Sequence, residues 1–227
     1  ILKPLKVVIE NYPENKTEWV DASYYPHDVP KEGTRPVPFS RELYIEQDDF
    51  MENPPKGFFR LTPGGEVRLR HAYIVKCEKV IKNANGEITE LRCTYDPATK
   101  SGADTSGKKV KGTIHWVDAH SSKQVEVRLY DRLFKMENPE NLDDMNPDSL
   151  QVLTNCFIEP AVITEKPDMR YQFERQGYFY VDPIDSTDEK PVFNRIVTLK
   201  DSWAKTVSKS EPNVEVKKEE VKPVYGH

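Results

Sequence analysis

The sequence has few cysteines, no long apolar run and no excess of positive charge. Its three cysteines form no CxxC pair, and an odd number argues against a disulfide framework, so we expect reduced, mostly buried thiols. No stretch approaches the roughly 18 apolar residues of a transmembrane helix, so we expect no membrane span. The chain begins without an initiating Met or an apolar targeting segment, which predicts an internal part of a longer, cytoplasmic protein.

Motifs for catalysis and for metal binding are also missing. The Pro-Gly-Gly at 63–65 is not followed by the Gly-Lys-Ser/Thr of a phosphate-binding loop. The five histidines show neither HExxH nor Cys/His spacing, and no G-x-S-x-G elbow occurs. We therefore expect no catalytic residue, no metal and no cofactor in this chain, and a function in binding.

The net charge of −5 does not favour a general polyanion binder, but the charges are unevenly distributed. Residues 53–80 hold six cations and two acids, a local charge of +4. Residues 135–150 hold one cation and five acids, a local charge of −4. This separation predicts one face that attracts RNA and another that repels it.

Segments rich in Val, Ile, Tyr and Trp predict an all-β protein. The expected strands are 5–10, 42–46, 66–76, 112–118, 124–133, 150–154, 171–181 and 192–199. Asn85-Gly86 predicts a tight hairpin between 73–82 and 87–95. Strands spaced in this way favour closed barrels, which have no exposed sheet edges.

Three shorter segments complete the organisation. Helical turns are expected at 40–42 and 47–50, and the polar segment 96–108 is expected to be a mobile loop. Residues 206–222 combine Lys, Glu, Ser and Pro with no aromatic residue, so we expect a disordered tail over 206–227.

Two groups of side chains are candidates for RNA contacts. In EVRLRH at 66–71, alternation places Arg68 and Arg70 on the face opposite Val67 and Leu69, and Arg60 precedes them across a turn. Guanidinium groups can stack on unpaired bases or bond to their edges, although a solvated strand face would have the same pattern.

The second group lies in RYQFER at 170–175. Gln172 and Arg175 are three residues apart, so strict alternation sends them to opposite faces. They can converge only through a bulge or turn, for which Gly177 is a nearby candidate.

Three ordered blocks are VRLYDRLF at 127–134, FERQGYF at 173–179 and KPVFNRIVTLKDSW at 190–203. Earlier blocks are KVVIENY at 6–12, VPFS at 37–40, EVRLRHA at 66–72 and KVKGTIHW at 109–116. Together they resemble the C-terminal anticodon-binding region of glutaminyl-tRNA synthetases, a class I aminoacyl-tRNA synthetase family, over nearly all of residues 1–205.

The resemblance implies two interlocked six-stranded β-barrels, similar to a ribosomal protein barrel that binds 5S rRNA, divided near residues 112–125. It implies that Arg70 faces the first anticodon base, that Gln172 and Arg175 hold the middle uridine, and that Arg60 binds a guanine in third position. An arginine that helps hold the middle base in the family would lie just upstream of Ile1.

Further implications concern supporting residues. Lys56, Arg68 and Ser202 would contact the RNA backbone or support the site. Gly57 and Phe59 stand where the family pattern has a glutamine and a lysine, so the sequence departs from the family pattern beside the expected third-base contact.

By the same resemblance, the partners are glutamine tRNAs and a catalytic domain of the same polypeptide that uses ATP and Mg, and the protein is expected to be monomeric. Three alternatives stay open: the anticodon domain of a glutamyl-tRNA synthetase, a ribosomal-type barrel that binds rRNA, and a β-barrel that binds proteins.

Overall fold

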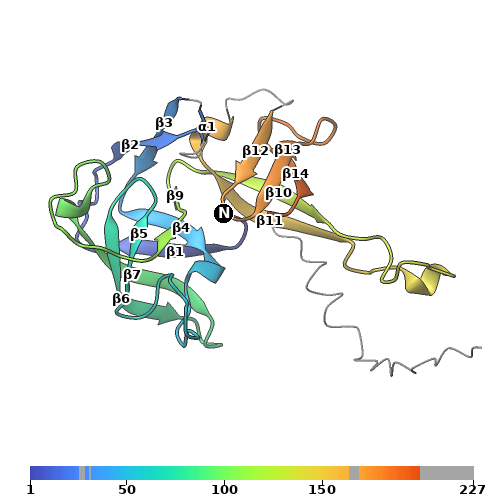
Figure 1. The fold of residues 1–227 in the computed structure, drawn as a ribbon, viewed down its shortest axis with the longest axis horizontal. Coiled ribbons are helices and arrows are strands. Elements are labelled where there is room, and N and C mark those ends of the chain that lie inside the picture. Colours follow the sequence, from blue (N-terminus) through green and yellow to red (C-terminus); the bar gives the residue numbers. More distant parts are fainter. Residues whose placement is uncertain (26–28, 31, 164–168, 200–227) are drawn as a thin grey trace, which may run out of the picture.

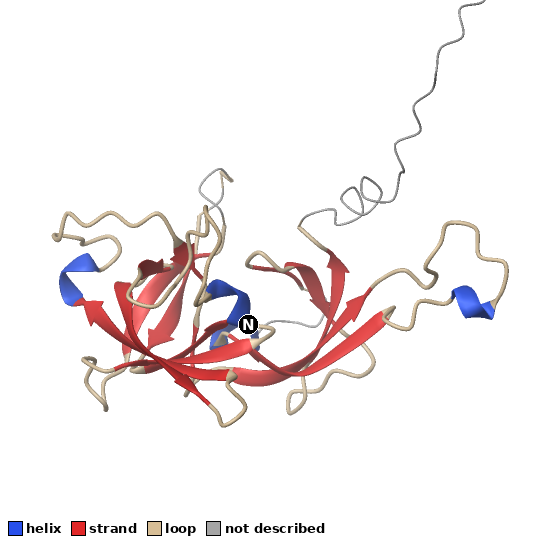
Figure 2. Ribbon diagram, turned by 90° about the horizontal axis from the view of Figure 1, so that it is seen from below, coloured by secondary structure: helices blue, strands red, loops and turns tan. Residues whose placement is uncertain are grey.

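The computed structural model describes residues 1–25, 29–30, 32–163 and 169–199. These residues form a mostly β structure with a large curled sheet, a second sheet beside it and a small two-stranded sheet (Figures 1 and 2). The expected all-β class is therefore confirmed. The expected tail at 206–227 and the candidate Ser202 lie outside the described residues.

The large sheet has the strand order β8-β5-β6-β7-β1-β4-β9. Its strands are β1 (Pro4–Ile9), β4 (Glu42–Glu46), β5 (Glu66–Leu69), β6 (Ile74–Lys82), β7 (Ile88–Asp96), β8 (Thr113–Ile114) and β9 (Val117–Asp118). The two-stranded sheet pairs β2 (Glu18–Ser23) with β3 (Thr34–Phe39). Both sheets contribute to one apolar core, in which Phe39 and Trp116 meet edge to face at 5.1 Å.

The second sheet has the order β11-β10-β14-β13-β12. Its strands are β10 (Lys123–Tyr130), β11 (Leu150–Ile158), β12 (Arg170–Phe173), β13 (Gly177–Val181) and β14 (Val192–Val197). A separate core packs Phe173 on Phe179 with ring centroids 4.3 Å apart. A one-turn helix, α1 (Pro160–Ile163), follows β11.

The start of the chain joins the two sheets. Leu2 belongs to the core of the second sheet, whereas β1 lies in the first. Ile1 and Phe157 exchange two backbone hydrogen bonds of 2.8 and 2.9 Å, and the Phe157 ring stacks on Tyr44 of β4 at 4.4 Å. The first residues thus hold the second sheet against the first.

Several expected strands are confirmed, and others are divided by turns. The segment 66–76 is not one strand, because the chain turns between β5 and β6, where His71 has φ of 63°. Likewise 112–118 contains the two short strands β8 and β9, and 171–181 is the hairpin β12–β13.

Some of the expected turns are confirmed and one is wrong. The hairpin at Asn85-Gly86 is confirmed as β6–β7, with Gly86 at φ of 82°. A 3₁₀ turn is present at Gln47–Asp49 as expected, but the one expected at 40–42 is wrong, because residue 42 already begins β4. Strands β2 and β3 were not predicted, because β2 contains only two strongly strand-favouring residues, Trp19 and Val20, and β3 contains two prolines.

Two observations bear on the absences expected from the sequence. No helix in the described residues is long and apolar enough to cross a membrane. All three cysteines are buried and free, as expected from their number and spacing.

Candidate nucleic-acid interface

A cleft of about 560 Å³ lies between the two sheets. It is lined by β2 and β3, by the turn that follows β5, and by β12 with its hairpin turn. Ile1, the first residue of the chain, also lines it. The polar side chains that face it include Arg35, Arg70, His115, Gln172, Glu174 and Arg175. Three of the four predicted base-contacting residues therefore share one cleft.

Arg70 is held firmly at the end of β5. Its backbone N–H donates to Ile114 at 3.0 Å, and its carbonyl accepts from the Trp116 indole at 2.9 Å. One terminal nitrogen of its guanidinium donates to Glu174 at 2.6 Å. Its Nε is buried and has no hydrogen-bond partner among the described residues, although 41% of the side chain is exposed. Arg70 is therefore a fixed guanidinium with donors left for a ligand.

Arg175 and Arg60 meet at one buried carboxylate, Asp49. Both terminal nitrogens of Arg175 bond to the Asp49 carboxylate, at 2.9 and 3.2 Å. Arg60 places its Nε 3.4 Å from the same carboxylate and donates to the Asp48 carbonyl at 2.8 Å. The side chain of Asp49 is 3% exposed, whereas those of Arg60 and Arg175 are 38% and 34% exposed. Asp49 thus orients two arginines while each keeps surface for a ligand.

The hairpin turn between β12 and β13 positions the second predicted group. Arg175 lies in this turn with φ of 60°, and Gly177 follows with φ of 138°. A side chain at Gly177 would meet the Val197 carbonyl, since an added Cβ would lie 2.3 Å from it. Gln172, in β12, is exposed and lines the same cleft as Arg175. Gln172 and Arg175 can line the same cleft only if a turn brings them together, and this hairpin turn lies next to Gly177, as predicted.

Arg68 has a different environment from Arg70. Its guanidinium donates to the Thr99 carbonyl at 2.7 Å, to Ser101 at 3.2 Å and to Asp104 at 2.7 Å. The predicted alternation holds within β5, where Val67 and Leu69 are buried and Arg68 between them is partly exposed. Arg70 lies just beyond the strand and faces the cleft, so the two arginines do not share one surface as expected. The donors of Arg68, however, hold the loop that follows β7 and do not face the cleft.

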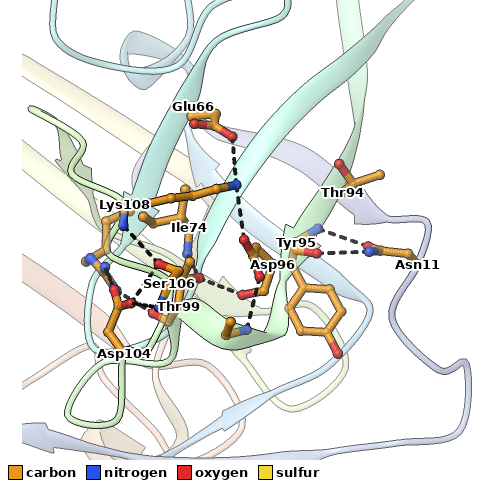
Figure 3. Close-up of polar contacts among 12 residues, drawn as sticks. Asn11, Glu66, Ile74, Thr94, Tyr95, Asp96, Thr99, Asp104, Ser106 and Lys108 are labelled. Carbon is orange, nitrogen blue, oxygen red and sulfur yellow. Dashed lines mark hydrogen bonds and ion pairs between the residues drawn. The ribbon is translucent and has the colours of Figure 1, made fainter.

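That loop is anchored by several polar contacts (Figure 3). The Thr99 hydroxyl accepts from the Ile74 N–H at 2.8 Å, and Asp104 accepts from Ser106. Lys108 lies between Asp96 and Glu66, at 3.0 and 3.5 Å. The segment 96–108, which we expected to be mobile, is thus tied to β5 and β6.

Lys56, the remaining described candidate, is exposed and lies in a turn outside the cleft. The Phe58 N–H donates to the Pro55 carbonyl at 3.2 Å, and Gly57 has φ of 88°. A glycine suits this position because other residues rarely adopt such a φ. Gly57 therefore allows the shape of this turn.

The cleft carries neutral imidazoles between its charged groups. Burial lowers the pKa of His115 to about 3, so this imidazole is uncharged at neutral pH. Burial, and then the charge of Arg70, also lower the pKa of His71. The cationic character of the cleft therefore comes from its arginines, which acidic side chains partly compensate.

Sequence reasoning missed the acidic partners Asp49 and Glu174. Asp49 was placed in a short helical turn, and Glu174 was part of a quoted motif, but neither was given a role. No spacing signal could have shown that residues 49, 60 and 175 meet, because that depends on how the sheets pack. Among the described residues no group of three or more His, Cys, Asp or Glu is arranged to hold a metal ion.

Both halves of the chain match known protein families. Residues 1–96 and 113–182 match two family descriptions that share the words "tRNA synthetases class I (E and Q), anti-codon binding domain". The glutamine–tRNA ligase of Bradyrhizobium diazoefficiens is 57% identical over 212 residues, which cover 92% of this chain and 38% of that protein. Those of Pseudomonas putida and Rhodopirellula baltica are 54% and 53% identical, over 89% and 93% of this chain, and each is covered to 36%.

The chain thus spans little more than a third of the length of these relatives. The two matched regions together take in β1 to β7 and the segment from β8 to the end of β13, which includes Arg60, Arg70, Gln172 and Arg175. The chain belongs to the anticodon-binding domains of the class I tRNA synthetases for glutamate and glutamine.

Proposed function

We propose that this chain reads the anticodon of glutamine tRNA, CUG or UUG, on behalf of a catalytic domain in the same polypeptide. The matched relatives are glutamine–tRNA ligases, and the chain corresponds to about a third of their length. In that setting, the remaining part of the polypeptide would attach glutamine to tRNA with ATP and Mg, and this chain would supply recognition only.

One observation carries the proposal: three partly exposed arginines are grouped together, since Arg70 and Arg175 line one cleft and Arg60 shares the Asp49 carboxylate with Arg175. Arg60 and Arg70 come from the first sheet region, and Arg175 comes from the hairpin of the second. Planar guanidinium groups can read the edges of unstacked bases with two hydrogen bonds. Three guanidinium groups arranged in this way suit an anticodon whose bases are separated from one another.

We assign one base to each group of side chains. Arg70 faces the first base; it lines the cleft, Glu174 fixes its guanidinium, and 41% of its side chain is exposed. Gln172 and Arg175 hold the middle uridine, and Arg60 binds the third base, a guanine. Lys56 contacts the RNA backbone. We also propose that the sheets close into two interlocked six-stranded barrels, with a division near residues 112–125.

The proposal predicts losses of affinity that are confined to single bases. Replacing Arg60, Arg70 or Arg175 by Ala should each cost roughly 1–3 kcal/mol with the matched anticodon, because one base loses its bidentate partner. Binding of the chain to anticodon stem-loops, each with one altered base, measures this. Each variant should lose discrimination at its own base and keep it at the other two.

Arg68→Gln is the matched control, because Arg68 is also a strand arginine but bonds to the 96–108 loop. It should leave discrimination at all three bases unchanged. Equal losses on matched and mismatched stem-loops for the three other variants would show that their arginines contact only phosphates, and would contradict the assignment.

A further inference from the structure

Phe59 is an exposed aromatic side chain beside the arginines, and none of the assignments above uses it. It is 54% exposed, whereas its neighbours Phe58 and Arg60 are half-buried. An exposed aromatic ring leaves a flat apolar area that a nucleic-acid base can cover by stacking.

Phe59 and Arg60 contact different neighbours. Arg60 lies over the Phe58 ring, 5.9 Å from its centroid, and approaches Asp49. Phe59 has the Lys111 ammonium 5.2 Å from its ring centroid. The Phe59 ring is therefore available to a nucleotide other than the one whose base Arg60 reads.

The backbone that carries Phe59 is fixed on both sides. On one side, the turn at Pro55 and Phe58 is closed by a hydrogen bond and contains Gly57 at φ of 88°. On the other side, Gly112 packs directly on Phe59, since a Cβ added there would lie 1.7 Å from the Phe59 carbonyl oxygen. A ring on a rigid backbone loses little conformational freedom when a ligand binds to it.

Two exposed lysines, one against this ring and one in the turn that precedes it, lack acidic partners in the described part of the chain. Lys56 precedes Phe59 by three residues, and Lys111 lies against its ring; within the described residues, neither forms an ion pair with an acid. Arg60, by contrast, is compensated by Asp49. A free ammonium group next to an exposed aromatic ring is complementary to a phosphate next to an unpaired base.

We infer that Phe59 stacks on an unpaired base of the bound RNA, on the nucleotide that flanks the one contacted by Arg60. Lys111 and Lys56 meet the adjacent phosphates. This inference rests on the proposed anticodon-reading function and adds a contact that does not depend on base identity, since every base offers a π-face.

The test compares three variants in binding to a CUG stem-loop over a series of salt concentrations. Phe59→Leu keeps an apolar side chain but removes the ring, and affinity should fall roughly 5- to 150-fold, the range for losing one stacked base. The fold-change should be the same for matched and mismatched anticodons. Phe59→Tyr should retain the affinity of the unaltered chain.

Lys111→Gln separates the charge from the ring. It should lower the slope of log affinity against log salt by about 1, whereas Phe59→Leu should leave the slope unchanged. Unchanged affinity in Phe59→Leu overturns the inference, and so does an equal loss in Phe59→Tyr. If the unaltered chain shows no anticodon preference, the proposed function itself fails; if it shows the preference and Phe59→Leu binds equally well, only the stacking contact fails.

Discussion

The surroundings of the buried Asp49 carboxylate have two opposite effects on its pKa. Burial, the larger effect, raises the pKa of Asp49 to about 6, although Arg175 and Arg60 favour its ionised form. At neutral pH the carboxylate is still ionised and holds both arginines. Because its pKa lies within a moderate pH range, the cost of burying this charge can be measured.

Asp49 should make the stability of the protein depend on pH in a defined window. The folded-state pKa of about 6 lies above the ordinary value of 3.8, so the folded protein binds this proton more tightly than the unfolded chain. Proton binding at Asp49 therefore stabilises the folded state fully below pH of about 4. This contribution, on the order of 3 kcal/mol, is lost as the pH rises through about 6.

Urea unfolding of the unaltered chain and of Asp49→Asn at several pH values between 4 and 7 measures this effect. The free energy of unfolding of the unaltered chain should fall relative to that of the variant as pH rises through the window. Glu174→Gln serves as the control, because Glu174 is a partly exposed carboxylate that also pairs with an arginine. Parallel pH profiles for the unaltered chain and Asp49→Asn would contradict the raised pKa.

At the scale of elements, the loop after β7 depends on Arg68. This side chain bonds to two carbonyl or carboxylate oxygens of the loop at 2.7 Å each. Arg68→Ala leaves those acceptors without their donor, so the free energy of unfolding should fall by about 1–3 kcal/mol. Amide hydrogen exchange in residues 96–108 should also become faster.

Lys109→Ala is the control for this prediction, since Lys109 is an exposed cation of the segment that follows the loop. It should change neither stability nor exchange. If Arg68→Ala left loop exchange unchanged and instead weakened binding to RNA, Arg68 would be an RNA contact and not an anchor.

The elements that the sequence predicted well are those with a strong local signal. Asn85-Gly86 marked the β6–β7 hairpin, and the alternation within β5, which buries Val67 and Leu69, was correct. The turn between β5 and β6 was missed because it contains no glycine or proline, and its positive φ falls on His71. Propensity alone continues a strand through such a residue.

Of the candidate site, only the residues expected to contact RNA could be predicted. The resemblance named Arg60, Arg70, Gln172 and Arg175, but it gave no partner for any of them. Asp49 and Glu174 acquire their roles when the second sheet packs on the first, because Asp49–Arg175 and Arg70–Glu174 each join residues more than 100 positions apart. Contacts of this kind depend on the tertiary structure, and no local pattern encodes them.

At the scale of the whole molecule, the two sheets form one interface and share the first residues of the chain. Arg35 of β3 bonds to Glu159, which follows β11, through two hydrogen bonds of 2.5 and 2.8 Å. This buried acid and the Ile1–Phe157 contact hold the walls of the cleft together. Side chains from both walls of the cleft would therefore contact the anticodon bases as one rigid surface.

Ion pairs reduce the separation of positive and negative charge that was expected from the sequence. The cations within 53–80 are largely paired, since Arg60, Arg68, Arg70 and Lys76 each bond to an acid. The acidic segment 135–150 lies in the arm that connects β10 to β11 and projects away from the two sheets (Figure 1). Recognition should accordingly rest on specific donors in the cleft more than on a general positive field.

The central claim is tested most directly by the anticodon preference of this chain. Binding to stem-loops with CUG and UUG should be compared with CUC and UUC at one stated salt concentration, because affinity for RNA depends strongly on salt. We predict tighter binding to the two anticodons that end in G. Preference for the two that end in C would contradict the claim and indicate a reader of glutamate tRNA.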